Sequence, residues 1–148
     1  MDDKKIQKDK KKILLIEECQ KMNRNMSTLI ETITDDYNVI SATSAKEDYN
    51  LFQKEKENLD AVISQTDFKD CKDLGLYDLM KKEKPELSYI LTSNKEYNHS
   101  KYKPDKFIKR RSQCNCDKNY ITMESHEDLK DIVFGSLKEI YKKSNTSN

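Results

Sequence analysis

The sequence predicts an α/β domain in which a five-stranded parallel sheet is covered by helices on both faces. Five short apolar runs, typical of buried strands, alternate with segments whose apolar residues follow a helical period. The length of 148 residues suits a single domain. We assign that domain to residues 11–143, between a charged, flexible tail (1–10) and a polar, flexible tail (144–148).

The strands are predicted from apolar runs that charged or polar residues bound at each end. Such runs are typical of strands buried on both faces of a parallel sheet, and they are too short for an ordinary helix. The predicted strands cover residues 13–16, 38–42, 59–64, 87–92 and 119–123.

The helices are predicted from apolar residues three or four positions apart, which line one face of a helix. Ser44 with Glu47, and Ser125 with Asp128, resemble capping boxes that begin the second and the last helix. Pro104 fits the first turn of a fourth helix. The predicted helical stripes lie at residues 22–33, 44–52, 76–80, 104–114 and 125–140.

Composition excludes several classes of function. The 28 basic and 27 acidic side chains give a net charge of +1, so no large field of one sign attracts nucleic acid or an anionic membrane. The longest apolar runs are far shorter than the roughly 20 residues that cross a bilayer, and no apolar secretion signal follows Met1. We therefore expect a soluble cytoplasmic protein with no membrane partner.

The cysteines are expected to be reduced thiols, as is usual in that compartment. Cys114 and Cys116 form a C-x-C pair, and Cys19 and Cys71 are predicted on loops of the same edge. Four thiolates bind zinc tetrahedrally, but C-x-C is a weaker signal than two C-x-x-C pairs. The sequence leaves the role of the four cysteines open.

Polar side chains stand where the predicted strands end. The carboxyl ends of parallel strands share one edge of the sheet, which is where open α/β sheets bind ligands. The residues predicted to meet there are Glu17, Glu18, Gln65, Thr92 and Met123.

The order of four motifs resembles the receiver domain of bacterial response regulators, the CheY-like module of two-component signalling. These motifs are "KKILLIEE" at 11–18, "DAVIS" at 60–64, "YILTS" at 89–93 and "NCDKNYITMESHEDL" at 115–129. The resemblance implies a flavodoxin-like (βα)5 three-layer sandwich with strand order 2-1-3-4-5. It also places Tyr120 at the aromatic switch position of the family.

Departures from the family pattern concern the phosphorylation pocket. The resemblance assigns Glu17 and Glu18 to the acidic pair that holds magnesium, and Thr92 to the hydroxyl position. Gln65 replaces the phospho-accepting aspartate, and Met123 takes the place of the family's lysine. A carboxamide cannot form an acyl phosphate, so we expect no aspartyl phosphorylation, weak or absent Mg²⁺ binding and no enzymatic activity.

A second alignment places the fifth strand at residues 106–110, with Phe107 at the switch position and Arg110 near the lysine. We prefer 119–123, because that strand then leads directly into the capping sequence at 125–128. The remodelled face that would contact partners includes Tyr120, Phe107, Arg110 and Arg111.

These features favour a stand-alone pseudo-receiver that acts by protein–protein interaction, with a signalling kinase or an output protein as its partner. A homodimer through the last strand and helix is a further option. One alternative is a true receiver that uses Asp67 as phosphoacceptor with Mg²⁺. Another is a nucleic-acid-binding regulator that uses the basic and aromatic residues of 94–111, although a solvated surface is the favoured interpretation of that stretch.

Overall fold

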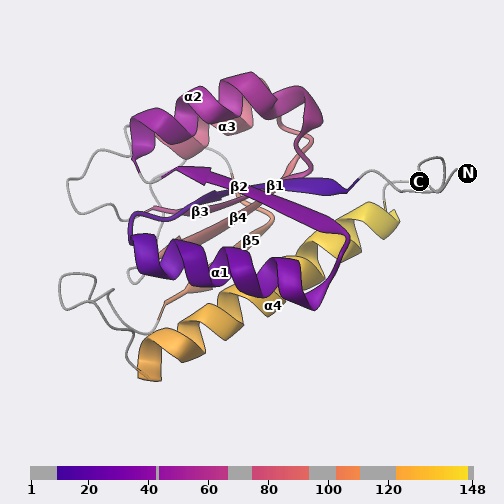
Figure 1. The fold of residues 1–148 in the computed structure, drawn as a ribbon. Helices are drawn as coiled ribbons and strands as arrows, with labels where there is room; N and C mark the ends of the chain where they lie inside the picture. Colours follow the sequence, from indigo (N-terminus) through magenta and orange to yellow (C-terminus); the bar gives the residue numbers. More distant parts are fainter. Residues whose placement is uncertain (1–9, 43, 67–74, 94–102, 111–122, 147–148) are drawn as a thin grey trace, which may run out of the picture.

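A computed structural model describes residues 10–42, 44–66, 75–93, 103–110 and 123–146. Within them lie a five-stranded sheet and four α-helices, arranged in three layers (Figure 1). No helix in these ranges is long and apolar enough to cross a membrane.

The sheet has the strand order β2-β1-β3-β4-β5, and every neighbouring pair is parallel. The predicted α/β, flavodoxin-like fold class is therefore confirmed. The strands are β1 (Lys11–Ile16), β2 (Tyr37–Ala42), β3 (Ala61–Gln65), β4 (Ser88–Ser93) and β5 (Lys106–Lys109).

The helices cover the sheet in two pairs, α1 with α4 on one face and α2 with α3 on the other (Figure 1). Their bounds are α1 (Gln20–Ile33), α2 (Ala45–Glu55), α3 (Leu76–Glu83) and α4 (Met123–Thr146), and a 3-10 turn, η2 (Lys56–Asn58), follows α2. As predicted, the Ser44 hydroxyl accepts a hydrogen bond from the backbone N–H of Glu47 and caps α2.

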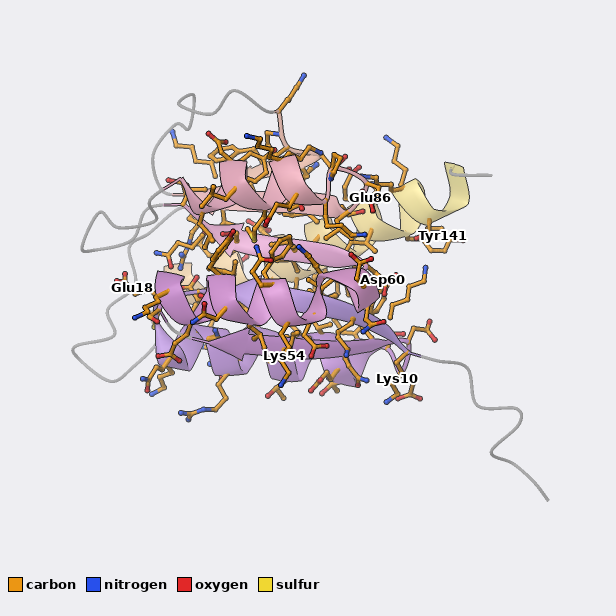
Figure 2. All side chains as sticks on the ribbon, turned by 90° about the horizontal axis from the view of Figure 1, so that it is seen from above. Lys10, Glu18, Lys54, Asp60, Glu86 and Tyr141 are labelled. Atoms are coloured by element: carbon orange, nitrogen blue, oxygen red, sulfur yellow. The ribbon has the colours of Figure 1, made fainter. Side chains whose placement is uncertain are left out.

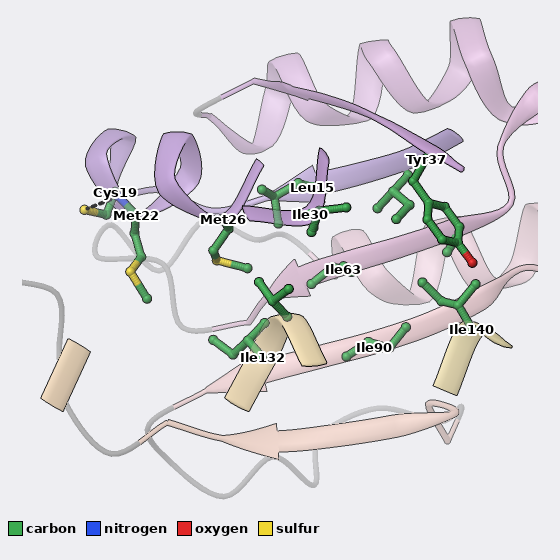
Figure 3. Close-up of a cluster of buried hydrophobic side chains, with 13 residues drawn as sticks. Leu15, Cys19, Met22, Met26, Ile30, Tyr37, Ile63, Ile90, Ile132 and Ile140 are labelled. Carbon is green, nitrogen blue, oxygen red and sulfur yellow. Dashed lines mark hydrogen bonds between the residues drawn. The ribbon is translucent and has the colours of Figure 1, made fainter. Parts of the chain in front are cut away.

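Each face of the sheet has its own apolar core. Figure 3 shows the core beneath α1 and α4, where Met26 and Ile30 of α1 meet Ile132 and Ile140 of α4 over the sheet. The opposite core joins Phe52 of α2 to residues of α3 and the central strands. Because β1, β3 and β4 are covered on both faces, their sequences are nearly continuous apolar runs.

The preferred position of the fifth strand was wrong. The strand paired with β4 is Lys106–Lys109, as the second alignment proposed, and Met123 is instead the first residue of α4. The predicted helix at 104–114 is therefore wrong where it overlaps β5, at residues 106–109. This edge strand supplies only one apolar residue to each core. Ile108 packs against the core beneath α1 and α4, and Phe107 packs against the core beneath α2 and α3.

Candidate functional site

The candidate site lies at the carboxyl end of the sheet, where β1, β3, β4 and β5 converge. Glu17 directly follows β1, Gln65 is the last residue of β3, and Arg110 directly follows β5. Gln65 and Thr92 are partners in the register of β3 with β4. Figure 2 shows Glu18 at this end of the molecule, with Lys10 at the opposite end.

A buried ion pair joins two strands that are far apart in the sequence. The Arg110 guanidinium (Nη1) donates to Glu17 Oε1 at 3.0 Å, and the two side chains are only 4% and 2% exposed. The backbone of Arg110 continues the ladder of β5, because its N–H donates to the carbonyl of Ser93 at 2.7 Å. Each charge is thus neutralised by the other inside the protein.

Glu17 is also held by the start of α1. Its second carboxylate oxygen accepts the N–H of Cys19, the N-cap of α1, at 3.1 Å, and its backbone carbonyl accepts the side-chain amide of Asn23 at 3.2 Å. Asn23 in turn accepts the Ser41 hydroxyl at 2.9 Å, which ties the site to β2. Both oxygens of the Glu17 carboxylate therefore have partners from the protein itself.

Gln65 points across the site to the loop after β1. Its side-chain oxygen accepts the backbone N–H of Glu18 at 2.8 Å, and only 8% of the residue is exposed. In β4, Thr92 is buried, and its carbonyl accepts the N–H of Thr66 at 2.9 Å. Hydrogen bonds thereby connect the ends of β1, β3 and β4.

Cys19 corrects the expectation of four reduced thiols, because this residue is disulfide-bonded. Its sulfur also accepts the N–H of Met22 at 3.5 Å and caps α1. The remaining cysteines, Cys71, Cys114 and Cys116, lie outside the described residues. Among the described residues, no group of His, Cys, Asp and Glu is arranged to hold a metal.

The structure thus brings together Glu17, Glu18, Gln65 and Thr92, as the sequence predicted, and adds Arg110 in place of Met123. Asp67, Tyr120 and Arg111 lie outside the described residues. Phe107 packs half-buried against the core beneath α2 and α3. Cys19 and Asn23, which donate hydrogen bonds to Glu17, could not be predicted, since an N-cap and a buried asparagine carry no distinctive spacing.

The residues that the structure describes at this site do not fit a divalent cation. Magnesium prefers carboxylate oxygens and water in an octahedral shell, but the Glu17 carboxylate already faces the Arg110 guanidinium. The oxygen of Gln65 carries no charge and is engaged by Glu18. A cation placed here would lie beside a fixed positive charge.

Comparison with protein-family models and with curated proteins found no match. Solved structures do match over nearly the whole chain. The response regulator domain of Thermotoga maritima CheB superposes with a TM-score of 0.68 at 14% identity, over 95% of this chain and all of that domain (100%).

This is the fold of a receiver domain. A response regulator receiver domain protein from Clostridium thermocellum gives a TM-score of 0.63 at 17% identity, covering 90% of this chain and 97% of that one. A structure of the histidine kinase ThkA in complex with the response regulator protein TrrA gives 0.52 at 18% identity, covering 83% and 98%. At such identities the likeness is one of fold.

Proposed function

We propose that this chain is a receiver-like domain of two-component-type signalling that acts through protein contacts and is not switched by aspartyl phosphorylation. The observation that carries the proposal is the pairing of Glu17 with Arg110 beside Gln65, at the edge where the matching receiver fold would hold its phosphoryl chemistry. The fold supports a role in two-component-type signalling, and the residues at the site support a role that does not depend on aspartyl phosphorylation.

Two chemical reasons favour an unphosphorylated mode. Forming an acyl phosphate requires a carboxylate oxygen as nucleophile, whereas Gln65 offers an amide whose oxygen is occupied by Glu18. Arg110 also balances the negative charge of Glu17, which would otherwise attract Mg²⁺ to the acidic pair. We infer that Mg²⁺ binding is weak or absent.

Contact with other proteins requires an accessible surface, and the chain offers one beside the edge strand. A groove of about 570 Å³ runs between β5 and the amino-terminal half of α4, and we name it the β5–α4 groove. It is lined by Lys106, Phe107, Ile108, Lys109, Glu127, Lys130, Asp131, Phe134 and Gly135. By analogy with the solved kinase–regulator complex, we propose a signalling kinase or an output protein as the partner.

The phosphorylation half of the proposal is tested by intact-mass spectrometry after incubation with acetyl phosphate and Mg²⁺. We expect no gain of a phosphoryl group in the wild-type chain. The Gln65→Asp/Arg110→Lys variant supplies a carboxylate acceptor and replaces the guanidinium with the shorter lysine side chain. It serves as the positive control. A phosphoryl gain in the wild type that Asp67→Asn abolishes would establish the true-receiver alternative instead.

The contact half is tested by affinity pull-down of the tagged chain from its own cell extract. We expect a defined set of bound proteins that is lost when Lys106 and Lys109 of the groove are both replaced by Glu. The matched control is Lys54→Glu, an exposed substitution on α2, away from the groove. If the groove variant binds the same set of proteins as the wild type, this surface is not the site of protein contact.

A further inference from the structure

Lys81 of α3 is a half-buried lysine near the amino end of the sheet. Its ammonium nitrogen (Nζ) lies 5.0 Å from the centre of the Tyr89 ring, near the start of β4, and donates to the backbone carbonyl of Pro85 at 3.3 Å. Glu86, just before β4, lies at the end of the molecule away from Glu18 (Figure 2). Lys81 is therefore remote from the site formed by the carboxyl ends of the strands.

The positive charge of Lys81 is only weakly compensated. Among the described residues, no carboxylate forms an ion pair with it, whereas Lys12, Lys84 and Lys143 each have one. The charged groups that act on Lys81 are Asp105 and Lys143, and these two pair with each other at 3.3 Å. Two ammonium groups thus share one carboxylate, and this Lys81–Asp105–Lys143 cluster has a surplus of positive charge.

These surroundings favour the neutral amine of Lys81. Burial removes water from the ammonium group and lowers the pKa of Lys81, and repulsion by Lys143 lowers it further, against the opposing attraction of Asp105. For comparison, the pKa of Lys84 is raised, because Glu86 accepts a hydrogen bond from it. A lysine that is partly removed from water beside a second cation is an activated nucleophile, since only the neutral amine has a free electron pair.

We propose that Lys81 is a site of acylation on its side-chain nitrogen and that its acyl donor is a small acyl phosphate. The Lys81 nitrogen attacks the carbonyl carbon of the donor and forms a new C–N bond. The C–O bond to the phosphate breaks, and its electron pair leaves with the phosphate. The nitrogen gives one proton to water, and nothing is oxidised or reduced. The surplus positive charge of the cluster favours a donor whose leaving group is an anion.

Acylation changes the contacts around Lys81 in a defined way. It removes the positive charge, and with it the attraction between this charge and the face of the Tyr89 ring. Asp105 is then balanced by Lys143 alone. The modification therefore alters the charge at the amino end of the sheet and leaves the Glu17–Arg110 pair at the carboxyl end in place.

Incubation of the full chain with acetyl phosphate, followed by peptide mapping with mass spectrometry, tests the inference. The initial rate of acetylation is measured at each lysine. We expect Lys81 to react several-fold faster than Lys54, an exposed lysine on α2, and its rate to reach a plateau at lower pH. In guanidinium chloride, which unfolds the chain, the two lysines should react at similar rates, because the preference depends on the fold.

Two variants test whether the neighbours of Lys81 cause the preference. Asp105→Asn removes the carboxylate that favours the ammonium form and keeps an oxygen for the N–H of Tyr89. It should accelerate acetylation of Lys81 and leave the rate at Lys54 unchanged. Lys81→Arg keeps the charge and should remove the fast acetylation alone. Circular dichroism checks that both variants are folded.

Acetylation of Lys81 no faster than that of Lys54 would overturn the inference. So would a preference for Lys81 that persists in guanidinium chloride, or a rate that Asp105→Asn leaves unchanged. Acetyl and phosphoryl groups add different masses to the chain. A phosphoryl gain would therefore refute the proposed function alone and would leave the assignment of Lys81 intact.

Discussion

Replacing Arg110 by Met removes the cation from the buried ion pair and leaves the Glu17 carboxylate in the interior. The two charges are 3.0 Å apart, and at an effective dielectric near 20 their attraction is on the order of 5 kcal/mol. The net contribution of such a pair is smaller, because burying each charge is costly. Losing only one partner, however, leaves the other charge uncompensated, at about 3–5 kcal/mol.

We expect Arg110→Met to lower the free energy of unfolding by about that amount, out of the roughly 5–15 kcal/mol that is usual for a domain. Urea denaturation followed by circular dichroism measures the loss. The double variant Glu17→Gln/Arg110→Met removes both charges and keeps an oxygen for the N–H of Cys19. It should recover most of the loss, since the two sites share one interaction.

An ion pair with exposed carboxylates is the control. Lys84 lies 3.3 Å from Glu57 and 2.8 Å from Glu86, which are 74% and 62% exposed, so Lys84→Met should cost much less stability than Arg110→Met. Two results would show that the pair does not hold the ends of β1 and β5 together. One is that Arg110→Met lowers the free energy of unfolding no more than this control does. The other is that the double variant loses as much stability as Glu17→Gln and Arg110→Met together.

Three further expectations concern stability. Burial raises the pKa of the Tyr89 hydroxyl above its usual 10.0. As pH rises, the unfolded chain therefore loses this proton before the folded chain does, and the free energy of unfolding falls above about pH 10. Urea unfolding should show that Tyr89→Phe removes part of that fall. Lys143 donates to the Leu87 carbonyl at 2.7 Å and pairs with Asp105 at 3.3 Å, so Lys143→Met should cost about 1 kcal/mol in the same assay, and no change would show that this contact is immaterial. Gly75 is the N-cap immediately before α3, with φ at 69° and open space around it. Gly75→Ala should therefore lower the melting temperature in calorimetry through about 1–2 kcal/mol of backbone strain, and an unchanged value would refute that strain.

The central strands could be predicted from the sequence because burial on both faces leaves a nearly continuous apolar run, as in β1 and β3. β5 could not be predicted with the same certainty. This strand is a four-residue edge with lysines at both ends, and its single Phe107–Ile108 pair also fits a helical stripe. Once β5 was misplaced, Met123 was assigned to the site where the structure has Arg110.

The Glu17–Arg110 pair itself could not be predicted from a local pattern. The two residues are 93 positions apart, and only the strand order brings them into contact. By contrast, Glu17, Glu18, Gln65 and Thr92 were predicted correctly as neighbours, because each stands at or beside the carboxyl end of a strand whose apolar run is unambiguous.

Gln65 and Arg110 alter the charge of the site in the same direction. An acidic pair with an aspartate at position 65 would concentrate three negative charges and would require a cation to be stable. With Gln65 and Arg110 in place, one net negative charge remains, on the half-buried Glu18 at the rim. We therefore expect that Gln65→Asp alone would not create a metal site, because Arg110 would still compete for the carboxylates. Gln65 and Arg110 are thus parts of one electrostatic arrangement, in which a guanidinium of the protein itself balances the charge of the Glu17 carboxylate.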